Sequence, residues 1–168
     1  MTGTLAVESN VEPNRLCFTL DEFLVRSLLD TSVLIALLDA SHIHHQLTAD
    51  WLQTHGDAGW ASCPITVNGC IRVLSQPTYP NRLPMQEVVT GLRQAMQNPL
   101  HEFWADDVNT ATTQAIDWTY TVRPAQLTDV YLLALAVAHN ARFVTLDQGI
   151  ALACVPQARV DQLVVLGV

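Results

Sequence analysis

The sequence predicts an α/β fold of three layers, in which helices cover both faces of a central, mostly parallel sheet of about five strands. Short apolar segments and helical patterns alternate five times along the chain, and the connections are long enough for parallel crossovers. The hydrophobic content is 49% and the charged content 14%, which suits a sheet whose two faces are both buried. A length of 168 residues is typical of one domain with a sizeable core.

The N-terminal part differs in character from the rest of the chain. Residues 1–25 are expected to form an extension, followed by a domain that spans 26–168. Residues 1–15 are polar and carry glycine, proline and asparagine, which is typical of a loose tail. Apolar residues recur over 16–26, and this pattern indicates a short docked helix or an interaction segment.

The first strand and the first helix of the domain meet at an acidic residue. Leu28-Leu29 supplies a short strand, and Asp30 ends it. The apolar pattern over 33–38 then predicts a helix, for which Thr31 or Ser32 can act as the N-terminal cap. In an open α/β sheet, functional residues usually lie at such junctions.

The later elements follow from similar start and stop signals. A helix is expected over about 44–53, with Gly56 as its stop signal. A short strand is expected over 60–63. Pro64 opens the next helix, because proline is favoured in a first helical turn. Further helices are expected over 64–75, 85–97, 109–117 and 125–139, the last stopped by Asn140, with strands over 102–105, 142–147 and 163–166 and a short helix around Ile150.

Three acidic residues stand at matching places in this pattern. Asp30 and Asp147 each follow a strand, so in a parallel sheet both carboxylates emerge at the same edge. Asp129 lies in the first turns of the helix that leads into the strand before Asp147. Three converging carboxylates cannot all stay ionised without a cation, and Mg²⁺ prefers carboxylates and water as ligands. The pattern therefore indicates a divalent metal site that can activate water.

Each acid also has an ordinary structural interpretation. Asp30 can be a helix cap, and Asp147 before Gln148-Gly149 suits a turn. Asp129 can be a first-turn acid favoured by the helix dipole. The functional interpretation thus depends on the three acids together.

Composition excludes several function classes. All eight basic residues are arginine, which argues against P-loop enzymes, Schiff-base enzymes and phosphate-receiver domains. The formal net charge of −8 disfavours non-specific binding to nucleic acid, so a polyanionic substrate would require bound metal and local arginines. Arg72, Arg82 and Arg123 are the candidates for phosphate contacts, with surface salt bridges as the alternative.

The cysteines and the apolar segments indicate a cytoplasmic protein. Cys17, Cys63, Cys70 and Cys154 form no C-x-x-C pair, and reduced, mostly buried thiols are expected. No secretory signal is evident at the start, and no apolar run reaches the roughly 20 residues that span a bilayer. The histidines at 42, 44 and 45 are expected to form a surface cluster, and the four tryptophans to lie in the core or an interface.

Four segments together resemble PIN-domain proteins and, among these, the VapC-type toxins of bacterial toxin–antitoxin pairs. The resemblance covers roughly 27–167, with the motifs in the family's order. The segments are Leu-Leu-Asp30-Thr-Ser-Val-Leu-Ile-Ala-Leu-Leu-Asp, Cys63-Pro-Ile-Thr with Asn68-Gly69 and Arg72-Val-Leu-Ser-Gln-Pro, Leu127-Thr-Asp129-Val-Tyr-Leu-Leu-Ala-Leu-Ala, and Phe143-Val-Thr-Leu-Asp147.

This resemblance implies a PIN-like fold and an endoribonuclease that depends on Mg²⁺ or Mn²⁺. It also implies an RNA substrate, a homodimer, and a cognate antitoxin that holds the enzyme inactive. Asp30, Asp129 and Asp147 match three of the family's acidic site positions, as catalytic residues and metal ligands.

The fourth acidic position does not match. The family typically has a glutamate directly before the Asn-Gly pair, where this chain has Val67. Valine cannot bind a metal, and Val67 extends the apolar stripe of Ile71 and Leu74. Asp106 and Asp107 are the nearest candidates to compensate, with a solvated loop pair as the alternative.

Two other functions stay open at this point. A PIN fold that has lost turnover would be a binding module for an antitoxin or RNA. A small-molecule phosphohydrolase would use Asp30 as its nucleophile, but it needs a second acid two residues later, where Ser32 stands. The Val67→Glu substitution tests the endoribonuclease interpretation, since it would supply the glutamate that the family has at this position.

Overall fold

The computed structural model describes residues 25–120 and 123–167. The loose tail expected over 1–15 lies outside this range, as does most of the docked helix or interaction segment expected over 16–26. Of the latter only Val25 and Arg26 are described, and neither is helical. The sheet has the strand order β3-β2-β1-β4-β5, and every neighbouring pair is parallel. The strands are β1 (Ser27–Leu29), β2 (Trp60–Ser62), β3 (His101–Phe103), β4 (Arg142–Thr145) and β5 (Leu163–Val165).

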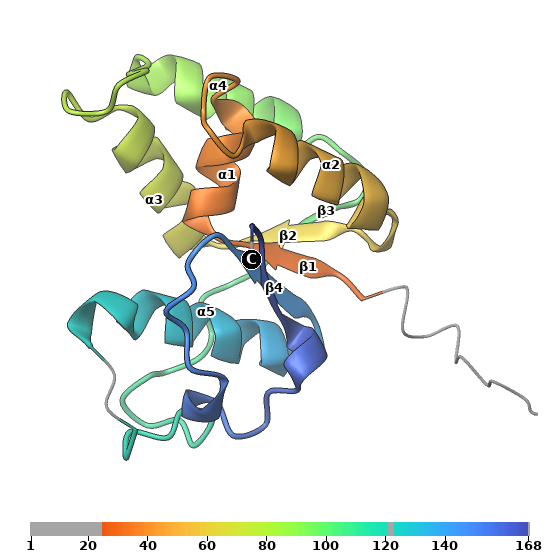
Figure 1. Ribbon diagram of the computed structural model, residues 1–168, viewed down its shortest axis with the longest axis vertical. Coiled ribbons are helices and arrows are strands. Elements are labelled where there is room, and N and C mark those ends of the chain that lie inside the picture. The colour runs from red at the N-terminus through yellow and green to blue at the C-terminus, as the bar shows by residue number, and fades with distance from the viewer. Residues whose placement is uncertain (1–24, 121–122, 168) are drawn as a thin grey trace, which may run out of the picture.

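Helices cover both faces of the sheet, as the sequence predicted. Figure 1 shows α1, α2, α3 and α4 on one face and α5 on the other. Their bounds are Thr31–Leu38, His45–His55, Pro64–Leu74, Met85–Ala95 and Leu127–Ala138, in that order, and short 3-10 turns span Gly56–Ala58, Pro124–Gln126, Leu152–Cys154 and Val160–Gln162. The fold is therefore a three-layer α/β/α sandwich.

Alternation along the strands divides the core into two clusters. Leu28 and Phe143 pack with α5, whereas their neighbours Leu29 and Val144 pack with α1, α3 and α4. All four side chains are buried. Successive side chains of a strand point to opposite faces, so these apolar runs of β1 and β4 serve both layers.

Helices α1 and α3 approach closely at Gly69. A Cβ atom added there would lie 2.6 Å from Thr31 Oγ1 and 3.0 Å from its Cγ2. Glycine permits this approach because it has no side chain. The contact brings the first turn of α1 beside the middle of α3.

The segment between β3 and α5 differs from the prediction. Residues 109–117 were expected to be helical, but they form turns and bends. Asn109 Oδ1 accepts a hydrogen bond from Ala111 N at 3.1 Å, and Thr113 Oγ1 accepts one from Ala115 N at 3.0 Å. Such local bonds offer the backbone an alternative to a helix. Ile116 anchors the segment, since its side chain is buried.

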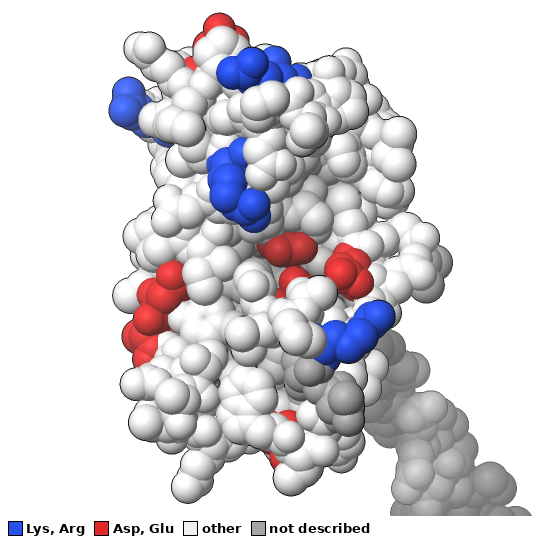
Figure 2. Space-filling view, turned by 90° about the vertical axis from the view of Figure 1, so that its left-hand side faces the viewer, with Lys and Arg blue, Asp and Glu red and all other residues white. Residues whose placement is uncertain are grey.

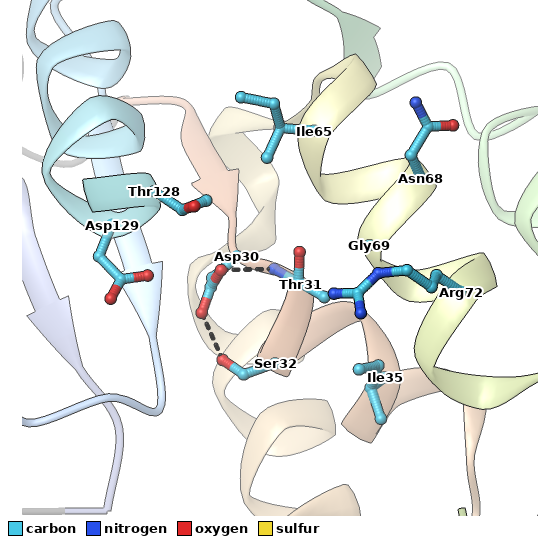
Figure 3. Close-up of a pocket in the computed structure, with 10 residues that line it drawn as sticks. All are labelled: Asp30, Thr31, Ser32, Ile35, Ile65, Asn68, Gly69, Arg72, Thr128 and Asp129. Atoms are coloured by element: carbon cyan, nitrogen blue, oxygen red, sulfur yellow. Dashed lines mark hydrogen bonds between the residues drawn. The ribbon is translucent and has the colours of Figure 1, made fainter. Parts of the chain in front are cut away.

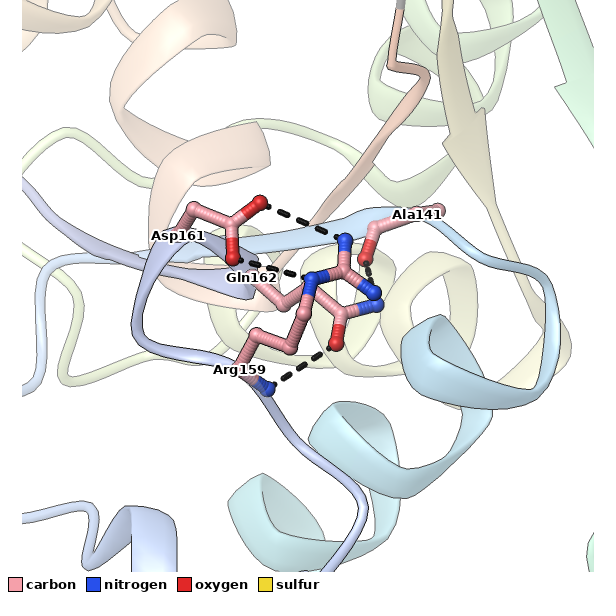
Figure 4. Close-up of polar contacts among 4 residues, drawn as sticks. All are labelled: Ala141, Arg159, Asp161 and Gln162. Atoms are coloured by element: carbon pink, nitrogen blue, oxygen red, sulfur yellow. Dashed lines mark hydrogen bonds and ion pairs between the residues drawn. The ribbon is translucent and has the colours of Figure 1, made fainter. Parts of the chain in front are cut away.

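The last strand is tied to the sheet by a buried glutamine. Gln162 donates from Nε2 to the Ala141 carbonyl at 3.2 Å and accepts from Arg159 N at 3.0 Å (Figure 4). An exposed ion pair of 3.2 Å joins Arg159 and Asp161 beside it. These contacts fix the chain just before β5, which forms one edge of the sheet.

Two composition-based predictions can be compared with this structure. Cys63, Cys70 and Cys154 are free and buried, as expected, while Cys17 lies outside the described residues. In the part of the chain that the structure describes, no helix is long and apolar enough to cross a membrane.

Candidate active site

Asp30 occupies the end of the central strand, as predicted, and caps the following helix itself. Its Oδ1 accepts a hydrogen bond from Thr31 N at 2.6 Å, so the expected cap, Thr31 or Ser32, is wrong. The Asp30 side chain is buried, with a relative exposure of 6%. A buried carboxylate needs hydrogen-bond donors or a cation. The second oxygen, Oδ2, accepts from Ser32 Oγ at 2.6 Å and from Thr145 Oγ1 at 2.8 Å.

Asp147 lies at the same edge, two residues beyond β4. The register pairs Leu29 with Val144, so Thr145 lies next to Asp30 across the two strands. Thr145 Oγ1 accepts a hydrogen bond from Asp147 N at 3.0 Å. The Asp147 carboxylate accepts from Gly149 N at 2.6 Å, which also gives it the turn role considered from the sequence.

Asp129 comes from the first turn of α5 and faces the other two acids. Burial raises the pKa of Asp129 to about 6, and the negative charges of Asp30 and then Asp147 add to the rise. Like charges disfavour further ionisation at close range. The three predicted residues are thus brought within electrostatic reach of one another.

A cleft of about 590 Å³ opens beside these acids between α1, α3 and α5. Asp30 and Asp129 line one side of it, and Arg72 of α3 lies on the other side (Figure 3). In Figure 2, acidic side chains gather around a hollow midway along the molecule, with basic side chains above and below it. The remaining lining residues are Thr31, Ser32, Ile35, Ile65, Asn68, Gly69 and Thr128.

Val67 does not face this cleft. It is half-buried and lines an apolar groove of about 290 Å³ between α3 and α4, together with Ile71 and Leu92. The cleft is lined instead by Ile65, Asn68 and other residues at helical spacing on α3. Successive helical residues point about 100° apart, so the side of α3 that meets the acids carries no carboxylate.

The other candidates from the sequence do not line the cleft. Asp106 and Asp107 are exposed and do not line it, which fits the alternative of a solvated loop pair. Arg82 donates to the Ser75 carbonyl at 3.2 Å, and Arg123 donates to Gln126 Oε1 at 3.3 Å. Trp118 is 49% exposed, contrary to a core position.

Ser32 and Thr145 contact the Asp30 carboxylate through their hydroxyl groups, and the sequence analysis did not predict these contacts. Thr145 stands two residues before Asp147 on a buried strand, which is a weak signal. Its place beside Asp30 depends on the register of β1 against β4, and a sequence alone does not give that register.

The chemistry of the donors fits a hard divalent ion, although the side chains are not arranged as a complete set of ligands. Within residues 25–120 and 123–167, no three His, Cys, Asp or Glu side chains are close enough together to hold a metal. The site offers carboxylate oxygens, which Mg²⁺ and Mn²⁺ prefer. Burial, and then the charges of Asp30 and Asp147, raise the pKa of Asp129, and a cation bound among the acids would offset both effects.

Comparison with known proteins identifies the family. The family model described as PIN domain matches residues 27–155. The chain is a PIN-domain protein. This PIN domain is also similar to Ribonuclease VapC44 of Mycobacterium tuberculosis, with 46% identity over 142 residues, covering 84% of this chain and 100% of that protein.

Further relatives agree with this assignment. Ribonuclease VapC29 of Mycobacterium tuberculosis is 37% identical over 124 residues, covering 74% of this chain and 87% of that protein. Among solved structures, a chain of the crystal structure of VapBC2 from Rickettsia felis bound to a DNA fragment from their promoter has a TM-score of 0.56 at 13% identity. It covers 84% of this PIN domain and 98% of that chain, and at this identity it shows the shared fold.

Proposed function

We propose that this PIN domain is a metal-dependent endoribonuclease, the toxin of a toxin–antitoxin pair. The observation that carries the proposal is the placement of Asp30 and Asp147 just beyond the neighbouring parallel strands β1 and β4, with Asp129 in the first turn of α5 close enough to feel both charges. The similarity of this PIN domain to Ribonuclease VapC44, over the whole length of that protein, supports the same activity.

Asp30, Asp129 and Asp147 would hold Mg²⁺ or Mn²⁺. When bound, such an ion lowers the pKa of a coordinated water and stabilises negative charge on a phosphoryl group. Asp30 is best prepared for this role, because three hydrogen bonds already fix its carboxylate. The pKa of Asp129 is about 6 in the metal-free protein, and a cation bound beside it would lower this pKa and favour the ionised form.

Arg72 is the residue that would orient the RNA backbone. Its guanidinium lies across the cleft from Asp129 and points toward the first turn of α1 (Figure 3). A guanidinium binds a phosphate through paired, charge-assisted hydrogen bonds. In a chain of net charge −8, this local cation offsets the repulsion between the acids and the substrate.

A cognate antitoxin and a second copy of the chain are the proposed protein partners. The relatives named VapC and the shared fold with a chain of VapBC2 support an antitoxin partner. The homodimer follows from the family resemblance.

A binding module without turnover is the second candidate. It is favoured by the absence of an acid on the cleft-facing side of α3 and by the incomplete ligand arrangement within the described ranges. Such a protein would keep antitoxin or RNA binding without cleavage.

The decisive experiment incubates the purified chain with structured RNA in Mg²⁺ or Mn²⁺ and measures cleavage alongside calorimetric titration of Mn²⁺. Cleavage that is lost with EDTA and in Asp30→Asn, but kept in the exposed control Asp50→Asn, is expected. RNA or antitoxin binding without cleavage would support the second candidate. Metal-independent cleavage that persists in Asp30→Asn would contradict the proposal.

A further inference from the structure

We propose that Ser32 and Thr145 are positioning residues that couple the Asp30 carboxylate to the backbone of Asp147, and that the affinity of the site for metal depends on this coupling. The inference rests on the proposed function, since it concerns the same acids.

Two hydroxyl groups share one oxygen of Asp30. Ser32 Oγ and Thr145 Oγ1 both donate to Asp30 Oδ2, at 2.6 Å and 2.8 Å. A hydroxyl has one proton, and each of these protons is thereby used. The two hydroxyl oxygens are left only as acceptors.

Both oxygens accept from consecutive backbone N–H groups of the segment that directly follows β4. Leu146 N donates to Ser32 Oγ at 3.3 Å, and Asp147 N donates to Thr145 Oγ1 at 3.0 Å. Two series of hydrogen bonds thus run side by side, each from a backbone N–H through a hydroxyl group to the same carboxylate oxygen of Asp30. Every donor in them points the same way, and aligned hydrogen bonds strengthen one another.

Water has little access to the link through Thr145, because Thr145 is fully buried and Asp30 is only 6% exposed. Ser32 is half-buried at the wall of the cleft. If one hydroxyl is removed, its backbone donor and the Asp30 oxygen both lose a partner. The segment that carries Asp147 then loses its fixed position relative to Asp30, and with it the spacing of two proposed metal ligands.

The expected loss of metal affinity is estimated from comparable changes at other metal sites. Groups that hold ligands in place typically change metal affinity by about 10- to 100-fold when removed. Thr145→Val keeps the shape of the side chain and removes the hydroxyl, whereas Thr145→Ser keeps the hydroxyl.

A purely structural role predicts a different result, and the chain offers a matched control. Thr48 is also fully buried, and its hydroxyl donates to backbone carbonyls of His44 and His45 at 3.0 Å and 2.9 Å. Thr48→Val therefore removes a buried hydroxyl of the same kind without touching the acids.

The test combines amide hydrogen exchange by NMR with calorimetric titration of Mn²⁺. In Thr145→Val, the Asp147 amide should exchange about tenfold faster, and Mn²⁺ affinity should fall by about 10- to 100-fold. In Ser32→Ala, the Leu146 amide should exchange faster by a similar factor, and Mn²⁺ affinity should fall as well. Thr145→Ser should keep the exchange rate and the Mn²⁺ affinity of the unsubstituted protein. Thr48→Val should change neither quantity.

Unchanged exchange at Leu146 and Asp147 in Ser32→Ala and Thr145→Val would overturn the coupling. Faster exchange with unchanged Mn²⁺ affinity would overturn its role in metal binding. If the unsubstituted protein binds no Mn²⁺ at millimolar concentration, the proposed function fails, and the exchange measurement still decides whether the coupling exists.

Discussion

Replacing Asp129 with asparagine is expected to stabilise the metal-free protein at neutral pH, although it removes a proposed metal ligand. Burial first, and then Asp30 and Asp147, raise the pKa of Asp129 from 3.8 to about 6. The folded carboxyl therefore holds its proton more tightly than the unfolded one. The resulting loss of stability is absent below pH 3.8, grows as the pH rises through this interval, and is complete above about pH 6.

The magnitude follows from the same pKa values. At about 1.4 kcal/mol per pH unit, the rise from 3.8 to about 6 corresponds to about 3 kcal/mol. Asp129 is only partly buried, so solvent screens its charge. We expect Asp129→Asn to gain about 1 to 2 kcal/mol in the free energy of unfolding above pH 6, and nothing below pH 3.8.

Urea unfolding in EDTA at a series of pH values measures this difference. The exposed Asp50→Asn substitution is the matched control and should show no such pH-dependent gain. Adding Mn²⁺ should raise the stability of the unsubstituted protein more than that of Asp129→Asn, because ligand binding stabilises the folded state. A gain that is independent of pH, or a net loss at pH 7.5, would refute the account of the site as mutually repelling carboxylates.

Three further substitutions test other parts of the structure. Val67→Glu should lower the free energy of unfolding by about 1 to 3 kcal/mol, because it places a carboxylate in an apolar groove. Tighter Mn²⁺ binding by this variant would contradict the position of residue 67 in that groove. Gly69→Ala should cost about 1 to 3 kcal/mol in the same assay, since its Cβ would lie 2.6 Å from Thr31 Oγ1; a double variant with Thr31→Ala that recovers nothing would refute this contact. Arg72→Gln should weaken RNA binding about tenfold in a filter assay and flatten its salt dependence, whereas equal weakening by Arg159→Gln, whose guanidinium pairs with Asp161, would argue against a specific phosphate contact.

The fold was predictable because strand and helix signals agree with the burial that each element needs. Leu28-Leu29 and Phe143-Val144 are apolar on both faces, and each face meets a helix layer. Asn140 ends α5 with a positive φ of 52°, as its sequence position suggested. The expected helix over 109–117 failed because its asparagine and threonine side chains bond to nearby backbone instead.

The site was predictable in its acids and less so in what surrounds them. Asp30 and Asp147 follow parallel strands, which fixes the edge where they emerge. Which residue of α3 faces that edge depends on the rotation of the helix, set by the Gly69 contact with Thr31. The family resemblance directed attention to Val67, whereas the structure places the next residue, Asn68, on the wall of the cleft.

The two edge strands limit how this PIN domain can associate with other chains. β3 and β5 lie at the ends of the sheet and have three residues each. Arg26 donates to the Leu100 carbonyl at 2.6 Å and pairs with Glu102 at 3.0 Å, so charged groups occupy the β3 border. Such short edge strands are poor templates for adding a strand from another molecule. Contacts with the proposed partners are thus expected on the helical surfaces rather than along the sheet edges.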